Sequence, residues 1–223
     1  MTFSIAGRCA RTGATGGVVC SSSIAVPSRC LWVNAHGVVL SQNVTDPRLG
    51  ALGLKLLADG FGAQSVLSQL SSARPFAEWR QIAVIDSDGD RAVHTGAKGL
   101  GITSTVSGTD CVAAGNLLAH EGVIAAMVEA FEASPEAFLA ERLLAALEAG
   151  ANAGGEAGPV HSAGFCVFER DVWPVAELRV DWSDSPISDL RANWQRYEPQ
   201  MRDYAKRARQ PDQAPSFGVP GDL

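Results

Sequence analysis

The sequence predicts an α+β fold in which two antiparallel sheets face each other and helices lie outside them. Three observations support this fold class. Strand-like segments come in groups, helical segments come in pairs between those groups, and each helical segment carries one apolar stripe, as an outer layer should. A chain of 223 residues suits one large domain, placed at residues 1–209, with a polar tail at 210–223 that is expected to be disordered.

The first third of the chain reads as an antiparallel sheet followed by two helices. Short apolar or alternating segments with close spacing predict strands at residues 2–8, 16–22, 30–33 and 37–41. Asp46-Pro47 then marks a helix start, because aspartate caps helices and proline suits the first turn. Leucines at helical spacing carry this helix to Gly60, and a second helix is expected at residues 63–72.

The middle of the chain combines a hairpin with a loop. Strands at residues 81–85 and 92–95 flank the turn Asp86–Asp90, whose Asp-Gly pair is a hairpin signal. A calcium loop of the EF-hand type would need flanking helices and a late glutamate, so we interpret these acids as a solvated turn and predict no metal site. Residues 96–110, rich in Gly, Ser and Thr, are predicted to form a mobile loop at the mouth of a site.

The last third alternates again between strands and helices. Strands are predicted at residues 111–116, 161–168 and 175–181, and a helix at 120–132. Ser134-Pro135 is expected to cap the next helix, which ends near Gly150. Ser185-Pro186 caps a final helix, which Pro199 interrupts, so that its continuation swings away or packs on a partner.

Composition limits the partners and the compartment. The net charge of −6 and the pI of about 5.2 argue against nucleic acid, which attracts basic surfaces. Only three lysines occur, so a polybasic membrane patch is not available, and no apolar run approaches the roughly 20 residues of a membrane helix. The N-terminus lacks the features of a signal peptide. We therefore expect a cytoplasmic protein that binds neither nucleic acid nor membranes.

The five cysteines are an odd number, are widely spaced and form no C-x-x-C pair, which predicts neither a disulfide framework nor a zinc site. Several lie in apolar strand-like runs, where small buried thiols are common. We interpret them as inert core residues. The alternative is a cysteine nucleophile, Cys20 or Cys30, acting near His36.

The first strand carries the strongest chemical signal. Phe3 and Ile5 alternate with Thr2 and Ser4, and Thr2 follows the initiator methionine directly. A small second residue normally permits removal of Met1, which would leave an N-terminal threonine. Its α-amine, with a reference pKa of roughly 7.7–8.0, could then activate its own hydroxyl. The simpler interpretation is that strands favour threonine.

A set of segments, taken in order, spans roughly residues 1–192: 1–6, 17–21, 37–47, 81–86, 115–118, 140–149, 161–163, 178–181 and 185–186. In these segments the sequence resembles a bacterial family of uncharacterised proteins, domain-of-unknown-function family 1028, which is grouped with the Ntn (N-terminal nucleophile) hydrolases. The resemblance implies a four-layer αββα sandwich with the nucleophile at the start of the first strand. Relatives with this fold cleave amide bonds through an acyl-enzyme, and no cofactor is implied.

Carried over by position, the resemblance makes Thr2 the nucleophile and its amine the general base. It makes Asn116, at a strand end, a donor to the developing oxyanion; a turn-forming asparagine is an equally weighted alternative. Further polar residues at strand ends are candidates for orienting the amine or binding a small-molecule substrate: Ser4, Ser21, Ser22, His36 and Gln42.

Two departures keep a second function open. Proteasome-like members of this fold use a lysine on an early strand, but no lysine precedes Lys55 here. A retained Met1 would block the threonine amine. The alternative to an amidohydrolase is therefore a non-catalytic ligand-binding or assembly protein on the same scaffold. A homodimer is also expected, with Trp194, Tyr197 and Tyr204 supplying an aromatic contact surface.

Overall fold

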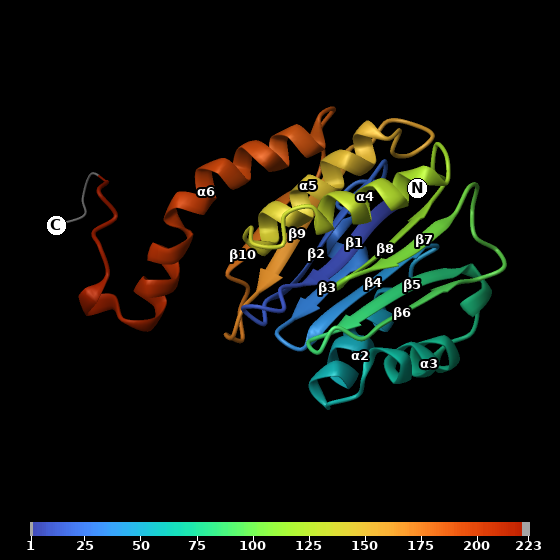
Figure 1. The fold of residues 1–223 in the computed structure, drawn as a ribbon, viewed down its shortest axis with the longest axis horizontal. Coiled ribbons are helices and arrows are strands. Elements are labelled where there is room, and N and C mark those ends of the chain that lie inside the picture. Colours follow the sequence, from blue (N-terminus) through green and yellow to red (C-terminus); the bar gives the residue numbers. More distant parts are fainter. Residues whose placement is uncertain (1, 220–223) are drawn as a thin grey trace.

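The structure, a computed structural model, describes residues 2–219 and contains two antiparallel sheets (Figure 1). The larger sheet has the strand order β10-β9-β2-β1-β8-β7. Its strands are β1 (Thr2–Arg8), β2 (Thr15–Ser21), β7 (Ser104–Gly108), β8 (Cys111–Asn116), β9 (Ser162–Phe168) and β10 (Ala176–Val180). The smaller sheet has the order β3-β4-β5-β6, formed by β3 (Leu31–Asn34), β4 (Gly37–Asn43), β5 (Arg80–Asp86) and β6 (Arg91–Thr95).

Helices cover the outer face of each sheet. The larger sheet is covered by α4 (Gly122–Glu132) and α5 (Leu139–Asn152), and the smaller sheet by α2 (Pro47–Ala58) and α3 (Ala63–Ala73) (Figure 1). The remaining helical elements are α1 (Pro27–Cys30), α6 (Pro186–Arg209) and the 3-10 turns η1 (Ala77–Trp79) and η2 (Pro211–Gln213). The expected layers of helices, sheet, sheet and helices are therefore present.

Alternation along β1 divides the core. Phe3 and Ile5 are fully buried against α4 and α5 in the largest apolar cluster, whereas Ala6 lies in the cluster between the two sheets. Because side chains alternate along a strand, Thr2 and Ser4 share the inner face with Ala6. The residues predicted to carry chemistry thus point toward the second sheet.

The elements follow the sequence pattern closely, but the short helix α1 was not predicted and two further segments differ from the prediction. The loop predicted at 96–110 contains the edge strand β7, whose Thr105 pairs with Ala114 of β8. The helix predicted to begin at Ser134-Pro135 begins instead at Leu139. Phe138 has an extended backbone, with φ −59° and ψ 143°, and its ring stacks on Trp194 of α6 at 5.9 Å, so this packing accompanies the later start.

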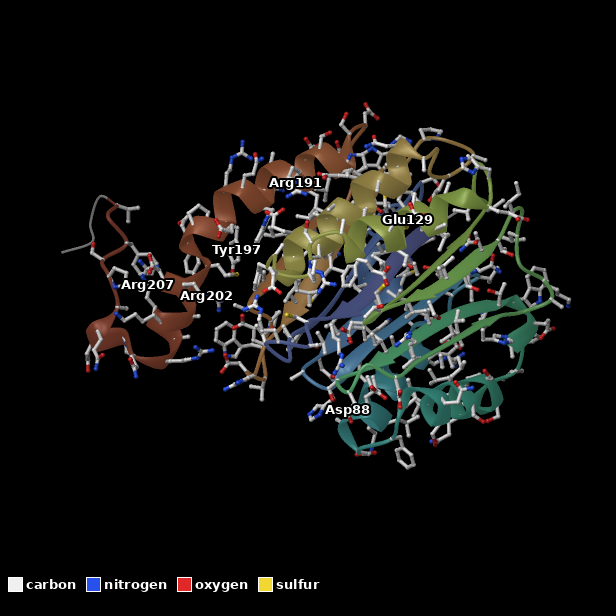
Figure 2. All side chains as sticks on the ribbon, viewed as in Figure 1. Asp88, Glu129, Arg191, Tyr197, Arg202 and Arg207 are labelled. Carbon is white, nitrogen blue, oxygen red and sulfur yellow. The ribbon has the colours of Figure 1, made fainter. Side chains whose placement is uncertain are left out.

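The final helix α6 continues through Pro199 to Arg209, and its second half bends and leads away from the sheets (Figure 1). Its first half is held to α5, where Arg191 forms ion pairs with Glu141 at 2.6 Å and Glu148 at 2.7 Å (Figure 2). In the segment predicted as a tail, η2 follows α6, and Arg207 donates to carbonyl oxygens of residues 215 and 216. Residues 220–223 lie outside the described residues.

Trp194 cannot serve the predicted dimer surface in this arrangement, because it is fully buried against Phe138 and Phe165 of its own chain. Tyr197 is half-buried and donates its hydroxyl to the Val175 carbonyl at 3.1 Å. Tyr204 is exposed. The homodimer stays a prediction, with a smaller aromatic surface than the sequence suggested.

Candidate functional site

A row of buried polar side chains crosses the larger sheet where β1 begins. Thr2 pairs with Asn116 of β8, and Ser21 at the end of β2 pairs with Ser162 of β9. Phe3 pairs with Cys20, so the register brings Thr2 level with Ser21. Paired residues of antiparallel strands point to the same face. The four side chains of the row, no more than 4% exposed, therefore lie on the inner face.

A second polar row faces the first from the smaller sheet. Gln42 at the end of β4 pairs with Gln81 of β5, which pairs in turn with Thr95 of β6. Gln42 and Gln81 are both buried, and residues 82–85, which follow Gln81 in β5, are apolar. Buried amides need hydrogen-bond partners, and these two find them across the gap between the sheets.

Hydrogen bonds join the two rows into one network. Ser4 Oγ donates to Gln42 Oε1 at 2.7 Å, and Gln42 Nε2 donates to Gln81 Oε1 at 2.8 Å. Asn116 Nδ2 donates to the same Gln81 oxygen at 3.1 Å. Gln81 Nε2 donates to Thr95 Oγ1 and to a β8 carbonyl, each at 3.0 Å. Gln81 is therefore the centre of the network and positions Asn116 beside Thr2.

The side-chain oxygen of Asn116 is the exceptional atom of the site. Asn116 is fully buried, and within residues 2–219 its Oδ1 has no hydrogen-bond partner. A buried acceptor without a donor costs roughly 1–3 kcal/mol, and a water, an ion or a ligand that donates to Oδ1 would remove that cost. Asn116 was predicted to donate to an oxyanion; as oriented here it also offers an acceptor next to Thr2.

Glu156 is a site residue that the sequence interpretation missed, because it lies in a segment predicted only as a glycine-rich turn. Its side chain is 5% exposed and accepts the Ser22 backbone N–H, at 3.3 Å to Oε1 and 3.2 Å to Oε2. Burial raises the pKa of Glu156 to about 7, partly offset by the positive chain N-terminus and by the hydrogen bonds from Ser22. Its protonation therefore changes near neutral pH.

This raised pKa predicts a pH-dependent stability. Between pH 4.5 and 7 the folded protein binds a proton at Glu156 that the unfolded chain has released, so this stabilising contribution is lost as the pH rises through 7. We expect roughly 2 kcal/mol of unfolding free energy to be lost between pH 5 and pH 8 on this account. Glu156→Gln should remove that part of the loss, measured by urea denaturation at both pH values. An unchanged pH dependence in the variant would contradict the assignment.

Two of the predicted serines make contacts with the loop after β2 and with Glu156. Ser21 Oγ lies 2.9 Å from Ser23 Oγ, and Ser22 is half-buried with its backbone N–H directed to Glu156. Ser162, which the sequence interpretation did not single out, donates to the Ser23 carbonyl at 2.6 Å and accepts the Val26 N–H. These contacts shape the loop that follows β2 at this end of the sheet.

His36 does not join the site. It lies in the turn before β4, and its carbonyl accepts the Ser87 N–H at 2.9 Å, close to Asp88 in the hairpin turn labelled in Figure 2. The seven residues of β4 separate it from Gln42's end of the sheet by roughly 20 Å. The sequence analysis placed His36 in the same site as Gln42, but His36 comes before β4 and Gln42 lies near its end, so the two residues are at opposite ends of the strand.

The alternative of a cysteine nucleophile, Cys20 or Cys30, required His36 close to the thiol, and His36 lies at the other end of the sheet. All five cysteines are buried. Burial raises the pKa of the Cys20 thiol, and it raises that of Cys30 to about 11. Neither thiol has His36 nearby. The interpretation as core residues agrees with these positions.

Exposed apolar side chains gather on the connections at this end of the sheets. Leu117 N donates to the Leu100 carbonyl at 2.9 Å, and Leu118 N donates to the Ile102 carbonyl at 3.0 Å, so the β6–β7 loop is held beside the end of β8. The larger exposed apolar residues on these connections are Ile24, Val44, Phe76, Leu100, Ile102 and Trp182. They give the polar site an apolar rim.

No lysine of the described residues is placed in the polar rows. Lys55 pairs with Asp59 on α2, and Lys98 pairs with Glu78 at 3.3 Å on the rim. Arg8 ends β1 at the other end of the strand and pairs with Asp110 at 2.6 Å. Whether Met1 is removed concerns a residue that lies outside the described part of the chain.

Comparison with known proteins assigns a family. The family model described as a family of unknown function (DUF1028) matches residues 2–190, so the chain belongs to this family. The crystal structure of protein SPO2555 from Silicibacter pomeroyi, also of DUF1028, is 32% identical, covers 92% of this chain and 90% of its own, and has a TM-score of 0.85.

A more distant similarity links the chain to Anbu from Hyphomicrobium sp. strain MC1, at 11% identity and a TM-score of 0.38, covering 97% of this chain and 100% of that one. This similarity is too low to bear on function. No curated protein matches the sequence. In residues 2–219, no helix combines the length and the apolarity needed to cross a bilayer.

Proposed function

We propose that this DUF1028 protein is an Ntn-type amidohydrolase that cleaves a small-molecule amide or a related C–N bond through an N-terminal Thr2. The observation that carries the proposal is the position of Thr2. It begins a central strand, pairs with Asn116, and shares its face with a buried polar network. A nucleophile site requires a hydroxyl, a base beside it and donors for the oxyanion; here Thr2 would supply the first two and the Asn116 amide would be the donor.

The proposed reaction has two halves. The α-amine of a processed Thr2 accepts the hydroxyl proton while Oγ attacks the substrate carbonyl, and the resulting ammonium returns a proton to the leaving amine. Water then hydrolyses the acyl-enzyme. Thr2 is 4% exposed, and loss of Met1 would remove the residue covalently attached to its nitrogen. The apolar rim suits a substrate with an apolar portion.

The second candidate is a non-catalytic ligand-binding or assembly protein. It is favoured by one observation: in the part of the chain that the structure describes, the three lysines lie away from the polar rows, on α2, on the rim and on α6. A nucleophile without a nearby cation would need another group to tune its amine. The two candidates differ in whether a covalent acyl group forms on Thr2.

Acylation of Thr2 tests the choice directly. The chain beginning at Thr2 and the chain retaining Met1 would each be treated with p-nitrophenyl butyrate, and intact mass and peptide mapping would locate any butyryl group. We expect a butyryl ester on the Thr2 side chain only in the processed chain. Absence of that ester, with the sheet structure intact, would favour the non-catalytic candidate.

A further inference from the structure

The loop after α5 lies across the end of the larger sheet where β1 begins. A β-bridge pairs Leu118 with Glu156, and the next residue, Ala157, donates its N–H to the Leu117 carbonyl at 3.0 Å. These contacts hold the loop against the residues that follow β8. Glu156 therefore has a fixed position beside that strand.

The side chain of Glu156 reaches toward the other neighbour of β1. Its carboxylate accepts the N–H of Ser22, the residue that follows β2, at 3.2 and 3.3 Å. Because β1 lies between β2 and β8, a group that joins the extensions of both strands lies next to the start of β1. The close approach of the loop agrees: a Cβ on Gly155 would be 3.5 Å from the Phe3 ring.

The carboxylate has no side-chain cation as partner. Glu156 is 5% exposed, and within residues 2–219 no Lys, Arg or His forms an ion pair with it. The titratable groups on the neighbouring elements are Cys20 on β2, His120 before α4 and His161 before β9. A buried carboxylate is stable only with hydrogen bonds and an opposite charge. The positive charge acting on Glu156 is that of the chain's α-amine, which belongs to Met1 before processing and to Thr2 after it.

We propose that Glu156 is the positioning residue of the site, whose carboxylate holds the α-amine of Thr2 in the processed chain. This inference rests on the proposed function and adds a residue to it. Glu156 takes the orienting role that Asp takes toward His in a Ser-His-Asp triad. Its negative charge favours the ammonium form and so makes the α-amine a stronger base, which is the opposite of the effect that a neighbouring lysine would have.

The proton balance of the reaction defines this role. When Oγ of Thr2 forms its bond to the substrate carbonyl carbon, its proton moves to the α-amine, which becomes a positively charged ammonium. The carboxylate of Glu156 stabilises that charge and keeps its own proton count unchanged. The ammonium then passes a proton to the departing amine, so the α-amine is neutral again when the acyl-enzyme has formed.

The test measures the pKa of the Thr2 α-amine rather than turnover. Chains beginning at Thr2 would be labelled with 13C-threonine, and the Thr2 signal followed by NMR against pH. We expect Glu156→Gln to weaken proton binding by the amine at least about tenfold, because a nearby negative charge is lost. Glu129→Gln is the matched control, since Glu129 is an exposed residue on α4 (Figure 2) and its loss changes the net charge equally. An unchanged amine pKa in Glu156→Gln would overturn the proposal.

A reciprocal measurement needs no substitution and so does not depend on how well the variant folds. The Glu156 carboxyl would be titrated by 13C NMR in the wild-type chain beginning at Thr2, with the α-amine free or acetylated. Blocking the amine should raise the pKa of Glu156, and an identical titration would contradict the contact. The two proposals can fail separately. If the pKa values of the amine and Glu156 depend on each other but no butyryl ester forms, the positioning role stands and the hydrolase proposal fails. If the ester forms but the pKa values are independent, the hydrolase proposal stands and the positioning role fails.

Discussion

Thr2→Ala, in the chain that begins at residue 2, is expected to lower kcat/KM for p-nitrophenyl butyrate by about 10³-fold or more. The substitution removes the only atom that attacks in the proposed reaction, and removal of a nucleophile commonly costs several orders of magnitude. Thr2→Ser keeps a hydroxyl beside the same amine and should retain part of the activity. Release of p-nitrophenolate under steady-state conditions measures both.

The control for this experiment is the same substitution at a threonine that lies at the opposite end of the sheets. Thr109→Ala, in the exposed turn between β7 and β8, should leave the rate unchanged. Urea denaturation would show that each variant is folded. Full activity in Thr2→Ala would exclude Thr2 as the nucleophile and would leave the ligand-binding candidate as the better account of the polar layer.

Gln81→Ala is expected to lower the unfolding free energy by roughly 3 kcal/mol or more. Gln81 is fully buried and accepts hydrogen bonds from Gln42 and Asn116 while donating to Thr95 and to the Gly115 carbonyl. Truncation would leave several of these buried groups without partners, each costing about 1–3 kcal/mol, less what water in the vacated space restores. Urea denaturation at fixed pH measures the loss.

Gln64→Ala is the matched control for Gln81, because Gln64 is exposed on α3 and its replacement should change stability by less than about 0.5 kcal/mol. A similar small effect for Gln81→Ala would mean that the polar network is not a stabilising unit. A large effect, with Thr2 acylation also lost, would show that the network both supports the fold and positions Asn116.

The spacing of apolar residues predicted most of the helices and strands, because that spacing reflects which side chains are buried. The alternation in residues 2–8 and the capping residues Asp46 and Pro47 each state a local preference, and the structure follows them. The start of α5 was missed because Phe138 packs on Trp194, a residue 56 positions further along the chain. β7 was missed because an edge strand of small polar residues lacks an apolar pattern.

The candidate site was predicted in part for a similar reason. The structure joins Ser4, Gln42 and Asn116 through Gln81 in one network, and Thr2 pairs with Asn116 beside it. Gln42 and Asn116 were candidates because they are polar residues at strand ends. His36 satisfies the same description but lies at the other end of its strand. Strand pairing decides which strand ends lie together in a sheet, and the pairing cannot be read from a single sequence.

The sequence by itself determined the α+β class, the alternation of the two faces of β1 and the chemical character of Thr2, because each depends on neighbours within a few residues. Only the tertiary structure decided that Gln81 joins the two sheets and that Glu156 lies beside the start of β1. Glu156 follows Thr2 by 154 positions and sits in a glycine-rich loop without periodicity. Its role depends on burial and on the long-range pairing of the loop, and no local pattern specifies either.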